Sequence, residues 1–291
     1  MTYRNACGAT PTRPRSMGAR RIVDKLHGLL AGAMPARRPI LALMALLCAG
    51  LATTAAAEGY SRAAELVLAR AFAATGGSNW YLLRGWRETG RQGGVAYESW
   101  IDPVRYGVRT EMRDGEGLSI HGFNGQADWR VGSDGMIAAV NDHASLARAR
   151  TEAFFAVNGY FFRGRFDASG DYVGVRSLGG RSFDVVRILP GGGEPRELWF
   201  DQKTRLLARI VDRNGRHASA LRVTDYRKVG PVRIPFRITP EPGSFSDGLA
   251  RQRESLVFEA VSRDLYSLNR PQELARVAAA RASPVEARRD D

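Results

Sequence analysis

The segment VRIPFRIT, residues 232–239, indicates the fold class of this chain most clearly. From Val232 to Ile238, apolar side chains occupy every second position, and polar side chains or proline occupy the positions between them. Because successive side chains of a strand point to opposite faces, this is the pattern of a β-strand with one buried face. Pro235 has no backbone N–H to donate to a neighbouring strand, so it predicts an edge strand or a bulge at this point.

Similar short alternating segments begin near Tyr81 and continue up to this strand, with turn signals between them. Pairs such as Asn-Gly and Asp-Gly favour tight hairpin turns between antiparallel strands. The turn pairs are Gly93-Gly94, Asp114-Gly115, Asn124-Gly125, Asp134-Gly135, Gly179-Gly180 and Asn214-Gly215. The sequence therefore predicts about ten strands in antiparallel succession, the last of them over residues 255–261.

Three segments have helical rather than strand character. A helix is predicted over residues 61–74, with Ser61 as its cap and Gly76-Gly77 as its stop. A second helix is predicted in the first part of 143–162, ending at Asn158-Gly159, and a third over 271–282. A sheet of about ten strands must curl, split or close. We therefore expect a mainly β, α+β fold, in which a large curled antiparallel sheet or incomplete β-barrel carries helices against its concave face.

The N-terminal region has the layout of a secretory signal peptide. Arg37-Arg38 precede an uncharged stretch, residues 39–57, which ends in Ala55-Ala56-Ala57. We predict that residues 34–57 are a signal peptide cleaved near Ala57, which makes the mature protein periplasmic. Residues 1–33 are then either untranslated or a disordered leader. The alternative is an inner-membrane anchor through residues 40–57, whose length lies at the lower limit for a bilayer span.

The composition of the mature part narrows its function. Cys7 and Cys48 are the two cysteines, so the chain from Glu58 onward has no disulfide and no thiolate site. Eight of the 43 basic and one of the 30 acidic residues precede Glu58, which leaves 35 against 29, a net charge of +6. This balance argues against nucleic acid as a partner and allows only a transient contact with anionic membrane surfaces. Residues 58–270 are expected to form a single domain, followed by a helix and tail over 271–291.

Catalytic motifs are not found. The histidines of the mature part, His121, His143 and His217, are far apart and lack metal-ligand spacing. The sequence contains no nucleophile elbow, phosphate loop or zinc-protease motif. We therefore predict a non-enzymatic protein without metal or cofactor. A hydrolase of unrecognised type stays open, because paired carboxylates leave no characteristic spacing.

The turns and aromatic residues resemble those of bacterial periplasmic proteins with the lipoprotein-sorting (LolA/LolB-like) fold. In particular, they resemble the subfamily also found as a domain in front of secreted aspartic peptidases. The likeness covers roughly residues 61–239 and is carried by Ala74-Thr75-Gly76-Gly77, Trp80, Leu83, Tyr97 to Trp100, Asp102, Gly122-Phe123-Asn124-Gly125, Trp129, Glu197 to Asp201, Thr204, Leu206, Leu207, Asp225-Tyr226-Arg227, Gly230 and Ile234-Pro235. The resemblance implies an incomplete β-barrel, lidded by helices, with an apolar cavity for acyl chains. No position matches a dedicated lipoprotein-binding arginine, and the Asp-Thr/Ser-Gly signature of the peptidase is absent.

Large aromatic side chains are the candidates for lining such a cavity, because pockets for apolar ligands are mainly hydrophobic and aromatic. The candidates on or beside strands, and those of the expected lid, are Trp86, Trp100, Trp129, Trp199, Phe154, Phe155, Phe161 and Phe162. The competing interpretation is that these rings simply fill the core. The favoured hypothesis is a monomeric carrier or binder of lipid or of the acyl chains of lipoproteins. The alternatives are an envelope interaction module without ligand and an accessory domain related to those of secreted aspartic peptidases.

Overall fold

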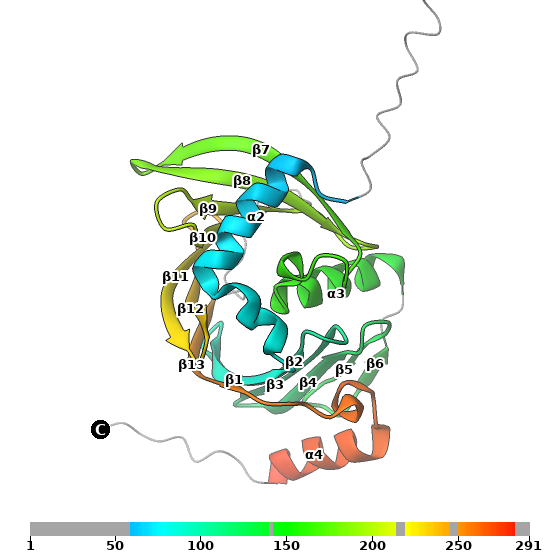
Figure 1. Ribbon diagram of the computed structural model, residues 1–291. Helices are drawn as coiled ribbons and strands as arrows, with labels where there is room; N and C mark the ends of the chain where they lie inside the picture. The colour runs from blue at the N-terminus through cyan, green and yellow to red at the C-terminus, as the bar shows by residue number, and fades with distance from the viewer. Residues whose placement is uncertain (1–58, 140–141, 214–218, 245–249, 283–291) are drawn as a thin grey trace, which may run out of the picture. The chain divides into compact units, whose positions relative to one another are not determined.

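The computed structural model describes residues 59–139, 142–213, 219–244 and 250–282, all within one compact unit, Thr54–Asp291. Its main feature is a single antiparallel sheet of 13 strands that curls around two helices (Figure 1). The strands are β1 (Trp86–Gln92), β2 (Val95–Asp102), β3 (Gly107–Asp114), β4 (Gly117–Phe123), β5 (Asp128–Val131), β6 (Ile137–Ala139), β7 (Ala168–Leu178), β8 (Arg181–Pro190), β9 (Arg196–Asp201), β10 (Leu207–Asp212), β11 (Ser219–Val229), β12 (Val232–Pro240) and β13 (Arg251–Phe258). The mainly β fold with a curled antiparallel sheet is thus confirmed, with more strands than the ten expected.

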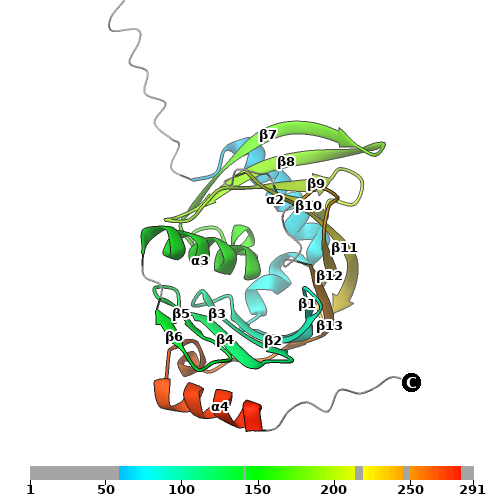
Figure 2. The same cartoon turned by 180° about the vertical axis from the view of Figure 1, so that it is seen from behind.

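The strand order shows how the chain builds this sheet. The order is β6-β5-β4-β3-β2-β1-β13-β12-β11-β10-β9-β8-β7. The chain therefore starts in the middle with β1 and runs out to one edge at β6. It then crosses to the opposite edge at β7 and returns to the middle, where β13 pairs with β1. The sheet is not closed, because β6 and β7 are its two edges, and the crossing segment between them contains α3 (Figure 2).

The hairpins form at the predicted turn signals. Gly93-Gly94 joins β1 to β2 with φ angles of 57° and 85°, and Gly179-Gly180 joins β7 to β8 with φ angles of 56° and 72°. Asn124-Gly125 lies between β4 and β5, where the Asn124 side chain accepts hydrogen bonds from the next backbone amides. Residues without a Cβ adopt these positive φ angles at no steric cost, which explains why the turn signals locate the strand ends. The pair Asn214-Gly215 lies outside the described residues.

The helix α2 (Arg62–Thr75) begins and ends as the sequence predicts, and the short helix η1 (Gly77–Leu82), which the sequence analysis did not predict, follows it directly. Ser61 is the N-cap, with its hydroxyl accepting from the amide of Ala64, and Gly76 ends the helix with a φ of 132°. A Cβ on Gly76 would lie 2.9 Å from the Pro231 carbonyl oxygen, so this position also needs glycine for lack of space. The buried side of α2 packs on β7, β8 and β12.

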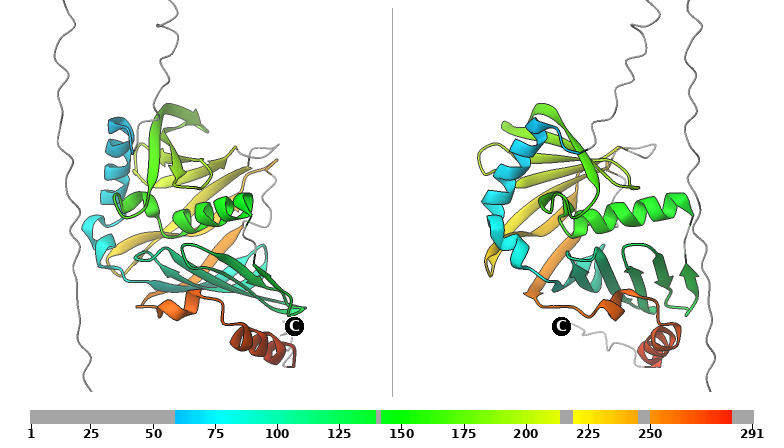
Figure 3. Two further views of the ribbon diagram at one scale, coloured as in Figure 1. Left: turned by 90° about the vertical axis from the view of Figure 1, so that its right-hand side faces the viewer. Right: turned by 45° about the vertical axis from the view of Figure 1, so that its right-hand side comes forward.

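The helix α3 (His143–Ala156) and the short helix η2 (Gly159–Phe161) form the crossing segment. Asp142 is the N-cap of α3. The helix is separated from η2 by Asn158, whose φ of 54° is left-handed. Figure 1 and Figure 3 show α2 and α3 on the inner side of the curled sheet, which we call the concave face. The main core lies between these helices and the sheet, and includes Trp80, Phe154, Phe162 and Ile188.

The opposite, convex face is covered in part by the C-terminal helix α4 (Arg270–Ala282), which packs on β4 and β5 (Figure 3). The short helix η4 (Arg263–Tyr266) leads into it. Beneath α4 lies a second core of Leu118, Ile120, Trp129, Val131 and Val277. The helix predicted over 271–282 is therefore present, and it lies on the face opposite α2 and α3.

The strand that carries the clearest alternation, β12, is an interior strand between β11 and β13. Pro235 is tolerated there because β13 pairs with β12 only at Arg237 and Ile238, so the ladder on that side does not reach the proline. In place of a strand neighbour, the guanidinium of Arg253 donates to the Pro235 carbonyl oxygen. The prediction of an edge strand was wrong, since the disruption by proline is confined to one side of an interior strand.

Candidate functional site

A cavity of about 60 Å³ lies on the concave face, between the sheet and the crossing segment of α3 and η2. Its sheet wall combines aromatic and aliphatic side chains from β1 and β9 to β12 with a polar pair from β1 and β13. The lining residues are Trp86, Glu88, Phe155, Ala156, Asn158, Tyr160, Leu198, Leu207, Ile210, Val223, Ile234, Pro235, Ile238 and Arg253. The arrangement is that of a small apolar site with a few polar groups at one place, which is the usual chemistry of a pocket for an apolar ligand.

The polar end of the cavity is a buried ion cluster around Glu88. The Arg253 Nε atom lies 2.7 Å from one oxygen of Glu88, and Arg251 Nη1 lies 3.2 Å from the other. The Tyr97 hydroxyl donates to the same carboxylate at 3.2 Å. Burial raises the pKa of Glu88, but the charges of Arg253 and Arg251 outweigh burial, so the pKa is lowered overall. One carboxylate and two guanidinium groups give the cluster a net positive charge, and Glu88 and Arg253 of this cluster line the cavity.

Trp86 and Tyr160 stand on opposite walls of the cavity. The Trp86 side chain is 2% exposed, and its indole N–H has no hydrogen-bond partner among the described residues. Burial of a polar N–H without a partner is unfavourable, so this group is available to an acceptor in the cavity. The Tyr160 hydroxyl donates to the side-chain oxygen of Asn158 at 2.9 Å, and burial raises the pKa of Tyr160, so the phenol stays neutral.

The four predicted lid phenylalanines occupy two different environments. Phe155 is partly buried and lines the cavity. Phe154, Phe161 and Phe162 are at most 6% exposed and belong to the main core instead. Their separation follows from the helix and turn geometry, because neighbours on a helix point in directions about 100° apart. Their role in contacting a ligand stays a prediction, with Phe155 in the position that it requires.

Of the four strand tryptophans, the structure places only Trp86 at the cavity. Trp100 pairs with Arg109 on the convex face, one position away from Ile101, which faces the main core. Trp129 lies under α4, where its indole N–H donates to the Tyr266 carbonyl oxygen at 2.9 Å. Trp199 belongs to a third cluster, built with Phe183, Val185, Val211 and Ala220, away from the main core. These three do not line this cavity, because strand alternation turns them to the face that the helices α2 and α3 do not cover. A role for them in contacting a ligand stays a prediction.

The polar residues of the site were not found from the sequence. Glu88 and Arg253 are 165 positions apart and meet because β13 pairs with β1. In the sequence, each lies in a strand where charged residues are common, so nothing distinguishes it from an exposed side chain. Only the pairing of the first strand with the last one reveals the contact.

The described residues show no group of three or more metal-ligating side chains that could hold an ion. His121 contacts Asp128 on β5, and His143 begins α3. His217 lies outside the described residues. At the cavity, the carboxylate of Glu88 is held by two arginines and has no neighbouring nucleophile among its lining residues.

Comparison with known proteins gives structural likenesses alone. No protein-family model matches the chain, and no curated protein matches its sequence. A LolA superfamily protein from Nitrosomonas europaea is 11% identical, with a TM-score of 0.47, covering 70% of this chain and 97% of that one. A DUF1329 family protein from Desulfovibrio piger is 11% identical, with a TM-score of 0.43, covering 70% of this chain and 96% of that one. A putative outer membrane lipoprotein-sorting protein domain from Vibrio parahaemolyticus is 11% identical, with a TM-score of 0.42, covering 67% of this chain and 91% of that one.

The superfamily that the sequence resembles thus recurs among structures similar to this one. At these identities and TM-scores, the likenesses carry no argument about the function of this chain. None of these three proteins is described as part of an aspartic peptidase, so that narrower resemblance is unsupported.

Proposed function

We propose that this chain is a non-catalytic carrier or binder of lipid, or of the acyl chains of lipidated proteins, with the chain held in the cavity of the concave face. The observation that supports the proposal is the cavity itself. It is lined by Trp86, Phe155 and six leucine, isoleucine and valine side chains, and it ends at the ion cluster of Glu88 and Arg253. An apolar tail would contact the aliphatic wall, and a polar group at its end would meet the positive end of the cavity.

The proposal requires the cavity to enlarge. A volume of about 60 Å³ is well below the roughly 150 Å³ of a cavity that admits benzene. The crossing segment can supply the difference, because α3 and η2 connect the two edge strands and are not part of the sheet ladder. Displacement of Phe155 and Tyr160 from the sheet would open the wall of the cavity while every strand pair stays intact. The left-handed residue Asn158, between α3 and η2, is the natural point for such a bend.

We further propose that the protein acts in the periplasm after removal of residues 34–57. The basis is the order of basic, apolar and Ala-x-Ala segments ahead of Glu58, and this region lies outside the described residues. Within the described residues, no helix is long and apolar enough to span a membrane. N-terminal sequencing of the purified periplasmic protein should give a start within two residues of Glu58. A product that begins upstream of Ile40 would contradict the assignment.

Two adjacent phenylalanines provide a matched test of the binding site. Phe154→Ala removes a ring that is 1% exposed in the main core, so we expect a loss of about 3–5 kcal/mol in stability. Phe155→Ala removes a ring beside an existing cavity, so the new void is smaller and the expected loss is below about 3 kcal/mol. Urea unfolding measures both losses. Titration of the delipidated protein with a fluorescent fatty-acyl probe should show weaker binding for Phe155→Ala, with Phe154→Ala less affected once its lower folded fraction is accounted for.

Mass spectrometry of an organic extract of the purified protein identifies the natural occupant. Co-purifying lipid, together with saturable binding of the probe, supports the carrier function. If the delipidated parent protein binds no probe, the carrier function is rejected in favour of an envelope interaction module.

A further inference from the structure

A second concavity lies away from the proposed acyl site, where three loops meet the start of η4. Its volume is about 520 Å³. The loops are those between β2 and β3, between β4 and β5, and between η2 and β7. The lining residues are Val104, Arg105, Tyr106, Gly107, Asn124, Gly125, Gln126, Arg165, Phe166, Arg263, Tyr266 and Ser267. We call this concavity the arginine cleft.

The three arginines of the cleft carry more positive charge than their neighbours balance. Arg105 pairs with the buried carboxylate of Asp102 at 2.9 Å. Arg165 donates to the Pro103 carbonyl oxygen at 3.1 Å and lies over the Phe162 ring, and it has no carboxylate partner among the described residues. Arg263 is exposed and has no hydrogen-bond or ion-pair partner in the described part of the chain. One of the three guanidinium groups thus has a carboxylate partner among the described residues, and an added anion could pair with the other two.

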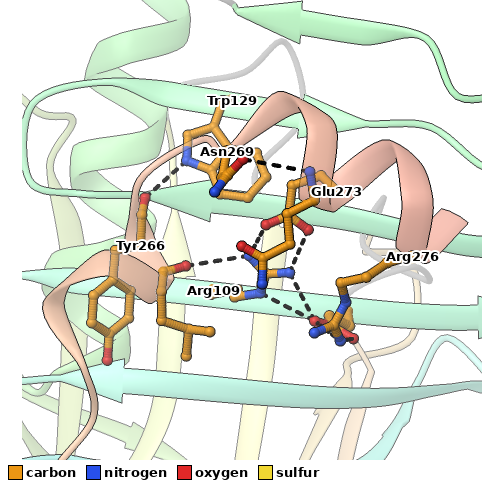
Figure 4. A network of polar contacts seen from close by, with 9 residues as sticks. Arg109, Trp129, Tyr266, Asn269, Glu273 and Arg276 are labelled. Atoms are coloured by element: carbon orange, nitrogen blue, oxygen red, sulfur yellow. Dashed lines mark hydrogen bonds and ion pairs between the residues drawn. The ribbon is translucent and has the colours of Figure 1, made fainter.

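The body of the cleft is aromatic and holds one unpartnered donor. The rings of Tyr106 and Phe166 stack with their centroids 4.8 Å apart. Tyr266 is 2% exposed, and its hydroxyl has no partner among the described residues. Its ring covers Gly107, where a Cβ would lie 2.8 Å from the ring. Figure 4 shows the hydroxyl pointing away from the ion pair of Arg109 and Glu273 under α4. Burial and, next, the charge of Asp102 raise the pKa of Tyr266, so the phenol remains a neutral donor.

The geometry points to a phosphate-type oxyanion as the ligand of the arginine cleft, held by Arg165 and Arg263 with the Tyr266 hydroxyl as a further donor. Guanidinium groups present paired donors that match the oxygens of phosphate, and hydrogen bonds between charged groups are about twice as strong as neutral ones. The same chemistry occurs in a free phosphorylated solute and in the headgroup of an anionic lipid. The inference does not depend on the proposed acyl site, since the two sets of lining residues share no member.

The test is the binding of inorganic phosphate and of vesicles to the full-length protein and three variants. Arg165→Gln/Arg263→Gln removes the two guanidinium groups that have no carboxylate partner among the described residues. Arg84→Gln/Arg233→Gln is the matched control, because it removes two exposed arginines outside the cleft and gives the same net charge. Tyr266→Phe removes one donor hydroxyl and keeps the ring, so it tests the cleft even if the double variant is unstable.

Calorimetric titration with inorganic phosphate should show saturable binding to the parent and the control. The cleft double variant should bind at least about tenfold more weakly, which corresponds to about 1.4 kcal/mol. Tyr266→Phe should weaken binding by about tenfold or more, as expected for loss of one hydrogen bond to a charged group.

Vesicles separate the two sources of the anion. Sedimentation with phosphatidylglycerol vesicles, but not with phosphatidylcholine vesicles, and its loss in the cleft variants, would assign a lipid headgroup. Phosphate binding without vesicle binding would assign a soluble phosphorylated ligand. If neither probe binds saturably, or if the cleft and control double variants are weakened equally, the anion site is rejected.

Discussion

The ion cluster that fastens α4 to the convex face allows the sharpest prediction. Arg109 is 1% exposed and donates to the two oxygens of Glu273 at 2.7 and 2.8 Å (Figure 4). The same guanidinium bonds to Glu111 at 2.9 Å, and Arg276 donates to Glu111 from the other side. Two arginines and two glutamates therefore form a cluster with no net charge, in which Arg109, Glu111 and Glu273 are buried and Arg276 is 39% exposed. Glu273→Gln keeps the shape of the side chain and leaves the cluster with one uncompensated positive charge.

The expected loss follows from burial and from the remaining partner. Removing one partner of a buried ion pair costs about 3–5 kcal/mol, because the other charge stays buried. Glu111 still contacts Arg109, and glutamine fills the space of Glu273, so we expect the lower end, about 3 kcal/mol. Glu254→Gln is the matched control. Its pair with Arg91 spans 3.7 Å, with side chains 57% and 64% exposed, so the expected loss is below about 1 kcal/mol.

Urea unfolding followed by tryptophan fluorescence measures both variants, and Trp129 under α4 reports on the region directly. A third variant, Arg109→Met/Glu273→Leu, replaces the pair with apolar side chains and should recover much of the stability lost in Glu273→Gln. The reasoning is refuted if Glu273→Gln costs no more than Glu254→Gln, since burial of the cluster would then have no energetic consequence.

Two other perturbations test the concave site and the packing beneath α4. The pKa of Glu88 is lowered from 4.5 by Arg253 and Arg251 against the opposing effect of burial, so its contribution is complete above about pH 4.5 and is lost as the pH falls through the folded-state pKa. Glu88→Gln should therefore lower the urea midpoint most at pH 7, and the difference from the parent should shrink below pH 4.5; a constant difference would contradict this. Gly122→Ala would place a Cβ 2.2 Å from the Trp129 ring, so we expect a loss of about 1–3 kcal/mol in urea unfolding, and an unchanged midpoint would show that the ring shifts freely.

Local signals in the sequence were sufficient for the three α-helices and for the antiparallel succession of strands. They did not give the number of strands, which is 13 where about ten were expected, or the bounds of the last strand, predicted over 255–261 and observed as β13 (Arg251–Phe258). The caps of α2, the end of α3 at Asn158 and the hairpin turns at Gly93-Gly94 and Gly179-Gly180 depend on residues within a few positions of one another. Such signals predict where strands and helices begin and end, and a succession of hairpins predicts an antiparallel sheet. The curl of the sheet also follows, because a flat sheet of this many strands is unfavourable.

The site required the tertiary structure. Strand alternation shows which side chains share a face, but it does not show which face the helices will cover. Trp86 and Trp100 lie in strands with equally regular alternation, and only the position of α2 and α3 turns one into a cavity residue and the other into a convex one. Likewise, Glu88 contacts Arg253 because the last strand, β13, pairs with the first strand, β1. The amino-acid sequence by itself therefore determined the strands, the helices and the curled antiparallel sheet. The tertiary structure alone decided which aromatic rings meet the cavity and which charges are buried together, since both depend on contacts between residues far apart in the chain.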